Sequence, residues 1–330
     1  MRVRAAKHLE AVSQHRDSDP GDNRTTPVPK ELVHKSAAAA VLLLGAEQCD
    51  ENRFAVATRW PTAGPTYRAD VQGTPVLLSE VMRQTAIYLS HRFYGVTLGH
   101  QFILSGLDLD FQGQTGNRPS AQAAQVEVAV TVATRTPRRF SASLDATVRQ
   151  NGHFIGSGTL RWLALEHSSY TRLRSRDPGA SDPFPAPGRP HGYLVEAESV
   201  GCSADADVLL ATAARGVNNA WDMVLDTGHP GHFDHPLDHV PGIAVIEAFR
   251  QAGYAWVRHS DKEAMPMLSN STSTFTAFGS LTAPVSIDIK HSAEVSPCLK
   301  AVELTASQFG GVIASNCATW VADGAGRSQW

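Results

Sequence analysis

The residue types best suited to chemistry recur in two places, each inside a long apolar stretch. Glu80 is followed three residues later by Arg83, and Glu247 is followed at the same spacing by Arg250. A buried carboxylate costs several kcal/mol unless it is paired or hydrogen-bonded, and residues three apart share one face of a helix. The pattern predicts two Glu–Arg pairs, which either order the core as ion pairs or belong to a catalytic site.

A histidine-rich segment, residues 229–242, leads directly into the stretch that carries Glu247. It holds four of the fourteen histidines and two aspartates. A neutral imidazole near a carboxylate can act as a general base, and a helix start offers free N–H groups to an oxyanion or phosphate. We therefore expect His235 and His239 to be catalytic. A metal site, or histidines that only cap the helix, are the alternatives.

The elements that position these residues occur twice. Adding 167 to the residue number (247 − 80) aligns E-x-x-R-Q of the first half with E-x-x-R-Q of the second, and residues 41–44 with residues 208–211. Later the offset becomes 158, so that Trp162 meets Trp320, as expected if one loop differs by nine residues. Matches in the same order across both halves predict a duplicated unit.

The chain therefore divides into four parts. Residues 166–195 are rich in Ser, Arg and Pro, which is typical of a solvated linker. We expect a flexible N-terminus at 1–30, a first repeat at 31–165, this linker at 166–195, and a second repeat at 196–330.

Each repeat combines one long helix with several strands. The expected helices span 75–94 and 241–259, with Pro in the first turn and Gly95 as the stop of the first. The first helix is apolar nearly all round, which predicts that it is wrapped by other elements. Expected strands are 39–44, 54–59, 125–134, 140–150 and 154–165, and then 208–211, 221–226, 285–290, 299–308 and 312–322.

A long helix inside a curled antiparallel sheet of five or six strands is an α+β unit with the hotdog layout. We predict a double hotdog, in which the two repeats pair within one chain as a pseudo-dimer. Such a pseudo-dimer reduces the need for a second subunit, so the protein is expected to be a monomer or a homodimer.

Bulk properties exclude several classes of protein. The 330 residues are 42% hydrophobic and 18% charged, and a net charge of −3 gives no general reason to bind nucleic acid or a membrane surface. The longest apolar run, residues 37–46, is half of the ~20 residues that span a bilayer. Four scattered cysteines form no CxxC pair. No dinucleotide, P-loop or G-x-S-x-G pattern is present, so we expect a cytoplasmic protein without a metal or cofactor.

Two resemblances sharpen the prediction. The run from His232 to Gln251 is similar to the helix start of hotdog 3-hydroxyacyl-carrier-protein dehydratases, in which a His and a helix Glu are catalytic. Glu247 takes the Glu position, and His232 lies one residue too far away for the His position.

The chain more closely resembles the A-factor (γ-butyrolactone) synthase family. Four motifs carry the resemblance: E-L-V-H-K (31–35), R-W-P (59–61), L-L-S-E-V-M-R-Q (77–84) and F-D-H-P-L-D-H-V-P-G-I…E-A-F-R-Q (233–251). It implies condensation of a β-ketoacyl thioester, carried by acyl carrier protein, with dihydroxyacetone phosphate. The product would lead to a γ-butyrolactone, butenolide or furan signal that regulates antibiotic production.

One departure from the family pattern guides the site prediction. Where the family has His-Asp-Pro before its first helix, this chain has Gly73-Thr74-Pro75, so we expect the chemistry beside Glu247 and a supporting role for Glu80. Glu247 would accept the hydroxyl proton, directly or through His235 or His239, while backbone N–H groups near residues 240–243 hold the oxyanion. Arg250 would hold the phosphate. The substrate would also contact Arg83, His232, Asp238 and Gln251.

Other readings remain open. The same groups could serve a dehydratase or thioesterase, or a non-catalytic acyl-binding protein. A basic cluster (Arg135, Arg138, Arg139) is either a solvated turn or a docking site for an acidic carrier protein.

Overall fold

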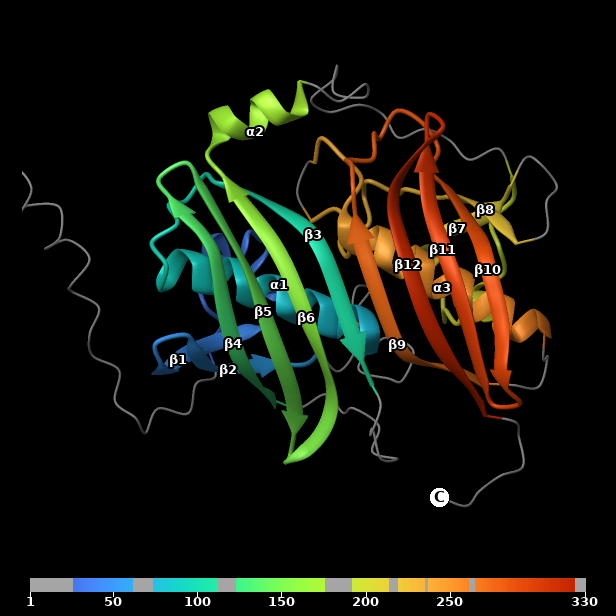
Figure 1. Cartoon of the computed structure of the whole chain (residues 1–330), viewed down its shortest axis with the longest axis horizontal. Coiled ribbons are helices and arrows are strands. Elements are labelled where there is room, and N and C mark those ends of the chain that lie inside the picture. The colour runs from blue at the N-terminus through green and yellow to red at the C-terminus, as the bar shows by residue number, and fades with distance from the viewer. Residues whose placement is uncertain are drawn as a thin grey trace, which may run out of the picture.

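Two long helices lie on the same side of one broad antiparallel sheet (Figure 1). The structure is a computed structural model that describes residues 26–61, 74–111, 123–175, 192–213, 219–234, 237–260 and 265–323. Helix α1 spans Thr74–Arg92 and helix α3 spans Gly242–Ser260. Both are within two residues of the bounds predicted from the sequence.

The sheet has twelve strands whose order is the same in the two halves. The first half runs β1-β2-β4-β5-β6-β3 and the second runs β7-β8-β10-β11-β12-β9, so β3 and β9 meet in the middle. The strands of the first half are β1 (Leu43–Asp50), β2 (Arg53–Arg59), β3 (Gln101–Asp110), β4 (Ala123–Thr136), β5 (Arg139–Gln150) and β6 (His153–Leu165). Those of the second half are β7 (Leu210–Thr212), β8 (Ala220–Met223), β9 (Met265–Phe275), β10 (Ser286–Ser296), β11 (Leu299–Gln308) and β12 (Gly311–Asp323).

This order confirms the predicted α+β double hotdog. Each helix α1 or α3 packs against its own half of the sheet and is buried along most of its length. Alternation in β4 places Val126, Val128 and Val130 on the buried face, as the period-2 pattern predicts. Gly95 ends the α1 segment in the left-handed conformation (φ 72°), which glycine adopts without steric cost.

The two hydrophobic cores meet at the junction between the halves. Ile243 and Ile246 of α3 belong to the apolar cluster around α1, while Leu268 and Phe275 of β9 pack against both clusters. Side chains from one repeat therefore complete the interior of the other, as expected for a pseudo-dimer.

The opening strands are shifted from their predicted positions. Residues 38–40 and 205–207 form 3-10 turns, and strands β1 and β7 begin at Leu43 and Leu210 rather than at 39 and 208. The predicted solvated linker contains helix α2 (His167–Arg174), which buries Tyr170 and Arg174. Most of the predicted N-terminal segment and residues 176–191 lie outside the described residues.

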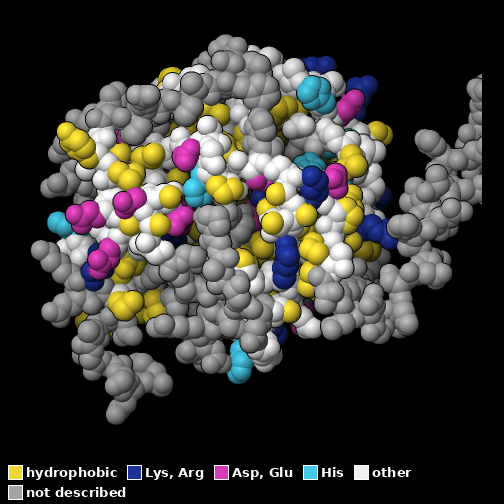
Figure 2. Space-filling view, turned by 180° about the vertical axis from the view of Figure 1, so that it is seen from behind, with side chains coloured by type: hydrophobic (Ala, Val, Ile, Leu, Met, Phe, Trp, Pro, Cys, Tyr) yellow, Lys and Arg dark blue, Asp and Glu magenta, His cyan; other side chains and the backbone are white. Residues whose placement is uncertain are grey.

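The surface seen from behind carries both signs of charge. Hydrophobic side chains are interspersed with acidic and basic ones there (Figure 2). Among the described residues, no helix combines the length and apolarity needed to cross a membrane.

Candidate active site between the two repeats

The predicted Glu–Arg pairs form at equivalent positions on α1 and α3. Arg83 donates two hydrogen bonds of 2.8 Å to Glu80, and Arg250 donates two of 2.7 Å to Glu247. The glutamine of each motif donates to the same carboxylate at 2.8 Å. Each cluster is therefore a bidentate ion pair held by a third side chain, a geometry that keeps both charges satisfied.

The glutamines also tie each helix to the opening segment of its repeat. Gln84 accepts from the backbone N–H of Leu42, and Gln251 accepts from that of Leu209, both at 2.8 Å. Since 42 + 167 is 209, the duplication extends to single hydrogen bonds. This part of the motif has a structural role in both repeats.

The two clusters differ at one neighbouring position. In the first repeat Lys35 lies 3.1 Å from Glu80, whereas Cys202 stands at the equivalent position of the second (35 + 167) and accepts from Arg250 at 3.7 Å. Burial alone would raise the pKa of Glu80, but the charges of Arg83 and Lys35 lower it to about 2. Burial and the charge of Glu247 raise the pKa of the Cys202 thiol to about 12, so this thiol stays protonated.

A cavity of about 530 Å³ lies between the repeats, and the first cluster lines it. One wall comes from α1, β3 and β6, and the other from the second repeat, within 231–234, 237–243 and 275–279. Most of the lining is apolar and includes Ile87, Leu104, Leu160, Trp162, Phe275 and Ile313. The polar part contains His34, Lys35, Glu80, Arg83, His232, Asp234 and His239.

The histidine loop, defined by its described residues 229–234 and 237–241, reaches from the second repeat to the first. Asp234 lies 3.5 Å from the Lys35 ammonium and accepts from the backbone N–H of Ser36 at 3.3 Å. The Ser36 hydroxyl donates to the backbone oxygen of Asp234. The loop that precedes Glu247 in the sequence is thus bound to the Glu80 side of the molecule.

His232 occupies the buried part of the loop. Its ring stacks on that of His229, with centroids 4.6 Å apart. Burial, followed by the charge of His229, lowers the pKa of His232 to about 4, and the charge of Glu247 opposes this shift. His232 is therefore neutral near pH 7.

His239, the last histidine of the loop, is held by a carboxylate. His239 and Asp238 are 2.6 Å apart, from Nδ1 to Oδ1, and Asp238 also accepts from the Tyr170 hydroxyl at 2.9 Å. Arg174 donates to the same carboxylate at 3.2 Å. Burial alone would raise the pKa of Asp238, but the bond to His239 and these other partners hold it well below its usual value. Asp238 is therefore ionised and fixes the orientation of a ring that lines the cavity.

The start of α3 forms another part of the wall. Gly242 and Ile243 line the cavity, and the first helical bond that follows is from Val245 N–H to the oxygen of Pro241. First-turn N–H groups have no partner within the helix, so they can bind an oxyanion. Val240 does not share this property because its N–H donates to Gly279 at 2.8 Å.

The structure divides the predicted site residues into two groups. Glu80, Arg83, His232 and His239 line the cavity, and Asp238 contacts it through His239. Glu247, Arg250 and Gln251 do not line it, and the Glu247 and Arg250 side chains are 11% and 4% exposed. His235 lies outside the described residues. No group of three or more His, Cys, Asp or Glu side chains within the described ranges is placed to hold a metal.

Lys35 and His34 were not predicted as site residues, although both belong to the E-L-V-H-K motif. Tyr170 and Arg174 were also missed, because they lie in the segment interpreted as a linker. All four residues come to the site through contacts between segments that are distant in the chain. No local sequence pattern encodes such contacts.

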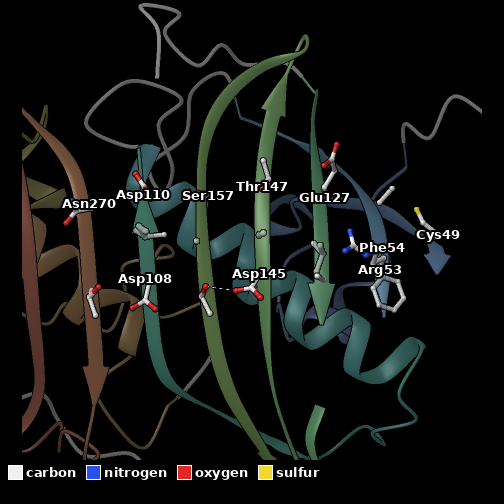
Figure 3. Close-up of a pocket in the computed structure, with 18 residues that line it drawn as sticks. Cys49, Arg53, Phe54, Asp108, Asp110, Glu127, Asp145, Thr147, Ser157 and Asn270 are labelled. Atoms are coloured by element: carbon white, nitrogen blue, oxygen red, sulfur yellow. Dashed lines mark hydrogen bonds between the residues drawn. The ribbon is translucent and has the colours of Figure 1, made fainter. Parts of the chain in front are cut away.

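A second hollow lies on the outer face of the sheet, opposite the helices (Figure 3). It is lined by strand residues of both repeats, and two of its carboxylates already have partners. Asp145 accepts from Thr159 at 2.6 Å, and Asp108 pairs with Arg161 at 2.7 Å. Among its described lining residues this hollow contains no histidine and no helix N-terminus, so it lacks the imidazole and the backbone N–H donors that the cavity between the repeats combines.

The fold and the cavity define a class of protein: two hotdog units in one chain, with a lined cavity between them. The chain belongs to the A-factor biosynthesis hotdog domain family, which matches residues 16–166 and 187–322. This assignment confirms the family predicted from the sequence motifs.

Curated relatives are named as enzymes. The 2-oxo-3-(phosphooxy)propyl 3-oxoalkanoate synthase of Streptomyces virginiae is 35% identical over 70% of this chain and 77% of its own length. The synthase of the same name from Streptomyces coelicolor is 30% identical over 73% of this chain and 76% of its own length. These names confirm that an enzyme is the correct class.

Solved structures are more distant. The 12:0-ACP thioesterase of Umbellularia californica has 12% identity and a TM-score of 0.46, covering 82% of this chain and 94% of that one. The family assignment rests on the sequence matches and not on this likeness.

Proposed function

We propose that the protein transfers a 3-oxoacyl group from a thioester to the hydroxyl of dihydroxyacetone phosphate. The product would be a 2-oxo-3-(phosphooxy)propyl 3-oxoalkanoate, the compound in the names of the two synthases. One observation carries the proposal. A single cavity combines an apolar lining, an oriented imidazole, a helix N-terminus and two cations.

We assign the proton transfer to His239. Asp238 accepts the Nδ1 proton of the ring, which leaves a lone pair on Nε2. His239 would take the proton of the acceptor hydroxyl as its oxygen attacks the thioester carbonyl. The C–S bond then breaks, and the same proton passes to the departing thiolate. Atoms and charge balance without a metal or cofactor.

The oxyanion formed during the attack would be held by the N–H groups of Gly242 and Ile243. Both residues line the cavity and lie within four positions of His239. Backbone donors fixed at a helix start stabilise developing negative charge without reorganisation. Val240, proposed from the sequence as a donor, is left out because its N–H is already bonded.

We place the phosphate beside Lys35 and Arg83. The Arg83 side chain is 24% exposed, so part of its guanidinium remains accessible while Glu80 holds the other part. Guanidinium and ammonium groups are the usual protein partners of phosphate. Glu80, with a pKa of about 2, is a weak base, and we assign it the role of holding these two cations in place.

The second cluster receives a structural role in this proposal. Glu247 and Arg250 satisfy each other, and Arg250 also donates to the backbone oxygen of Val200 at 3.2 Å. We infer that the cluster fixes the start of the second repeat. In this proposal Glu247 has a structural role in place of the catalytic role that was expected from the sequence.

The carrier of the acyl group is proposed to be acyl carrier protein. Arg138 and Arg139 lie at the turn between β4 and β5, and the backbone oxygen of Arg138 accepts from Glu166, directly before α2. Helix α2 supplies Leu173 to the cavity and carries the exposed Arg172. These arginines therefore form a basic surface close to the cavity, suited to an acidic partner.

A product assay tests the reaction directly. Purified protein is incubated with 3-oxoacyl carrier protein, with and without dihydroxyacetone phosphate, and the products are separated by mass. The proposal predicts the phosphorylated ester only when the acceptor is present. Free acid formed at the same rate with and without the acceptor would identify a thioesterase, and an enoyl product would identify a dehydratase. Binding without any product would identify an acyl-binding protein.

A further inference from the structure

The cavity wall contains a pair of histidines that the proposed reaction does not use. Nε2 of His34 and Nε2 of His91 are 3.0 Å apart, and the edge of Phe102 packs against the His34 ring. His34 and Phe102 line the cavity, and His91 lies behind them in the last turn of α1. A contact between two such nitrogens requires a proton between them, because two lone pairs would repel.

The backbone fixes which nitrogens carry protons. Nδ1 of His91 lies 2.7 Å from the backbone oxygen of Val96, so it must be an N–H donor. In the neutral pair, His34 then donates its Nε2 proton to the Nε2 lone pair of His91. One added proton gives a cation shared by the two rings. Burial, opposed by the bond to Val96 and assisted by the charge of His100, lowers the pKa of His91, which favours the neutral form of this ring.

The pair occurs only in the repeat whose Glu–Arg cluster lines the cavity. His34 adopts a left-handed backbone conformation (φ 53°), and the equivalent position in the second repeat is Gly201 (φ 68°). The position equivalent to His91 in the second repeat is Arg258 (91 + 167). Glycine suits this conformation better than any other residue, so a histidine here indicates a requirement for its side chain.

The charges along the cavity show what the pair could supply. Among the described lining residues, Lys35 and Arg83 are positive while Glu80 and Asp234 are negative, which gives a sum of zero. A phosphate group carries close to two negative charges above its second pKa of ~6. Binding it at a neutral wall would leave the negative charge uncompensated, and a proton taken up nearby would offset part of it.

We propose that the His34–His91 pair is the protonatable part of the phosphate site and takes up one proton when a phosphorylated acceptor binds. This inference rests on the proposed function. The charged and titratable groups that line the cavity or act on the pair are Lys35, Glu80, Arg83, His100, His232, Asp234 and His239. Of these, His100, His232 and His239 are the competing proton acceptors, and burial with the charges of His229 and Lys35 keeps His232 neutral.

Calorimetry measures the proton directly. Dihydroxyacetone phosphate is titrated into the full chain at pH 7.5, without acyl donor, in buffers of different ionisation enthalpy. We expect an uptake of roughly one proton per phosphate bound, and none with dihydroxyacetone. His34→Gly, which copies Gly201, should reduce the uptake to near zero. In the complete reaction this variant should raise KM for the acceptor roughly tenfold with little change in kcat. His91→Gln tests the partner ring, and His153→Gln, at an exposed hairpin, is the matched control.

The outcomes separate the two claims. Unchanged proton uptake in His34→Gly would place the proton on another group and overturn the role of the pair, while the proposed reaction stands. Failure of the wild-type chain to bind dihydroxyacetone phosphate would overturn both. Loss of uptake in both pair variants, with normal uptake in His153→Gln, would support the inference.

Discussion

At the scale of single residues, the proposed function depends on which side chains are charged and which one transfers a proton. Glu80 is buried and ionised, with a pKa lowered to about 2 from its ordinary 4.5. Its interactions with Lys35 and Arg83 therefore stabilise the folded state above pH 4.5. That contribution is lost as the pH falls from 4.5 toward 2.

We expect Glu80→Gln to lower the free energy of unfolding near pH 7 by on the order of 3 kcal/mol. The difference from the wild type should shrink toward pH 3, where the carboxylate loses its advantage. Urea unfolding at the two pH values measures both quantities. The exposed Glu127→Gln serves as the control and should leave stability unchanged at either pH. An equal loss from Glu80→Gln at pH 3 and pH 7 would show that its charge does not matter.

The Asp238–His239 pair gives a second prediction at this scale. Asp238→Asn removes the acceptor that fixes the ring of His239, so kcat should fall by ~10²–10⁴ while KM for dihydroxyacetone phosphate changes little. Tyr170→Phe, which removes the hydroxyl that donates to the Asp238 carboxylate but leaves the carboxylate itself, should have a much smaller effect. If the two variants lost activity equally, the ring would not be the base.

Sequence patterns identified the reactive residue types and the two Glu–Arg pairs, but not the contacts between the repeats. Glu247 and the histidine loop are neighbours in the chain, and this adjacency suggested one site. In the folded protein the loop contacts Lys35 and Ser36, and it lies beside Glu80. Pairing between repeats depends on how two units dock, which spacing along the chain does not encode.

At the scale of elements, the helices and the long hairpins were predictable because their apolar periodicity is strong. The central strands β3 and β9 were not predicted. Strand β9 is rich in Ser, Thr and Asn, and its burial comes from neighbours on both sides rather than from its own hydrophobicity. Tertiary context decides the structure of such strands.

A further prediction concerns the turn between β4 and β5 and helix α2, where the carrier protein is proposed to dock. Reversing charge with Arg138→Glu and Arg139→Glu should raise KM for 3-oxoacyl carrier protein at least several-fold and weaken its salt dependence. Activity with a small 3-oxoacyl thioester that lacks the protein should stay the same. Equal losses with both donors would mean that these arginines act on the fold and not on docking.

At the scale of the whole molecule, duplication has produced two similar clusters, of which one lines the cavity. The hydrogen bonds of Gln84 are repeated by Gln251, yet Lys35 and His34 stand beside the first cluster, where the second repeat has Cys202 and Gly201. The internal repeat could be predicted from the sequence because E-x-x-R-Q occurs twice. A difference between the copies was also predicted, but with the chemistry beside Glu247; which cluster lines the cavity could not be predicted, because it depends on a loop contributed by the other half.

The duplication supplies its own matched control for the central claim, that chemistry occurs beside the first cluster. The most direct measurement is the steady-state kinetics of ester formation by Arg83→Gln and by Arg250→Gln, with folding checked by circular dichroism. Because we place the phosphate beside Arg83, we expect at least a tenfold higher KM for dihydroxyacetone phosphate in Arg83→Gln. Folded Arg250→Gln should keep a KM near that of the wild type and lose only stability. The reverse result, with KM raised in Arg250→Gln and unchanged in Arg83→Gln, would contradict it.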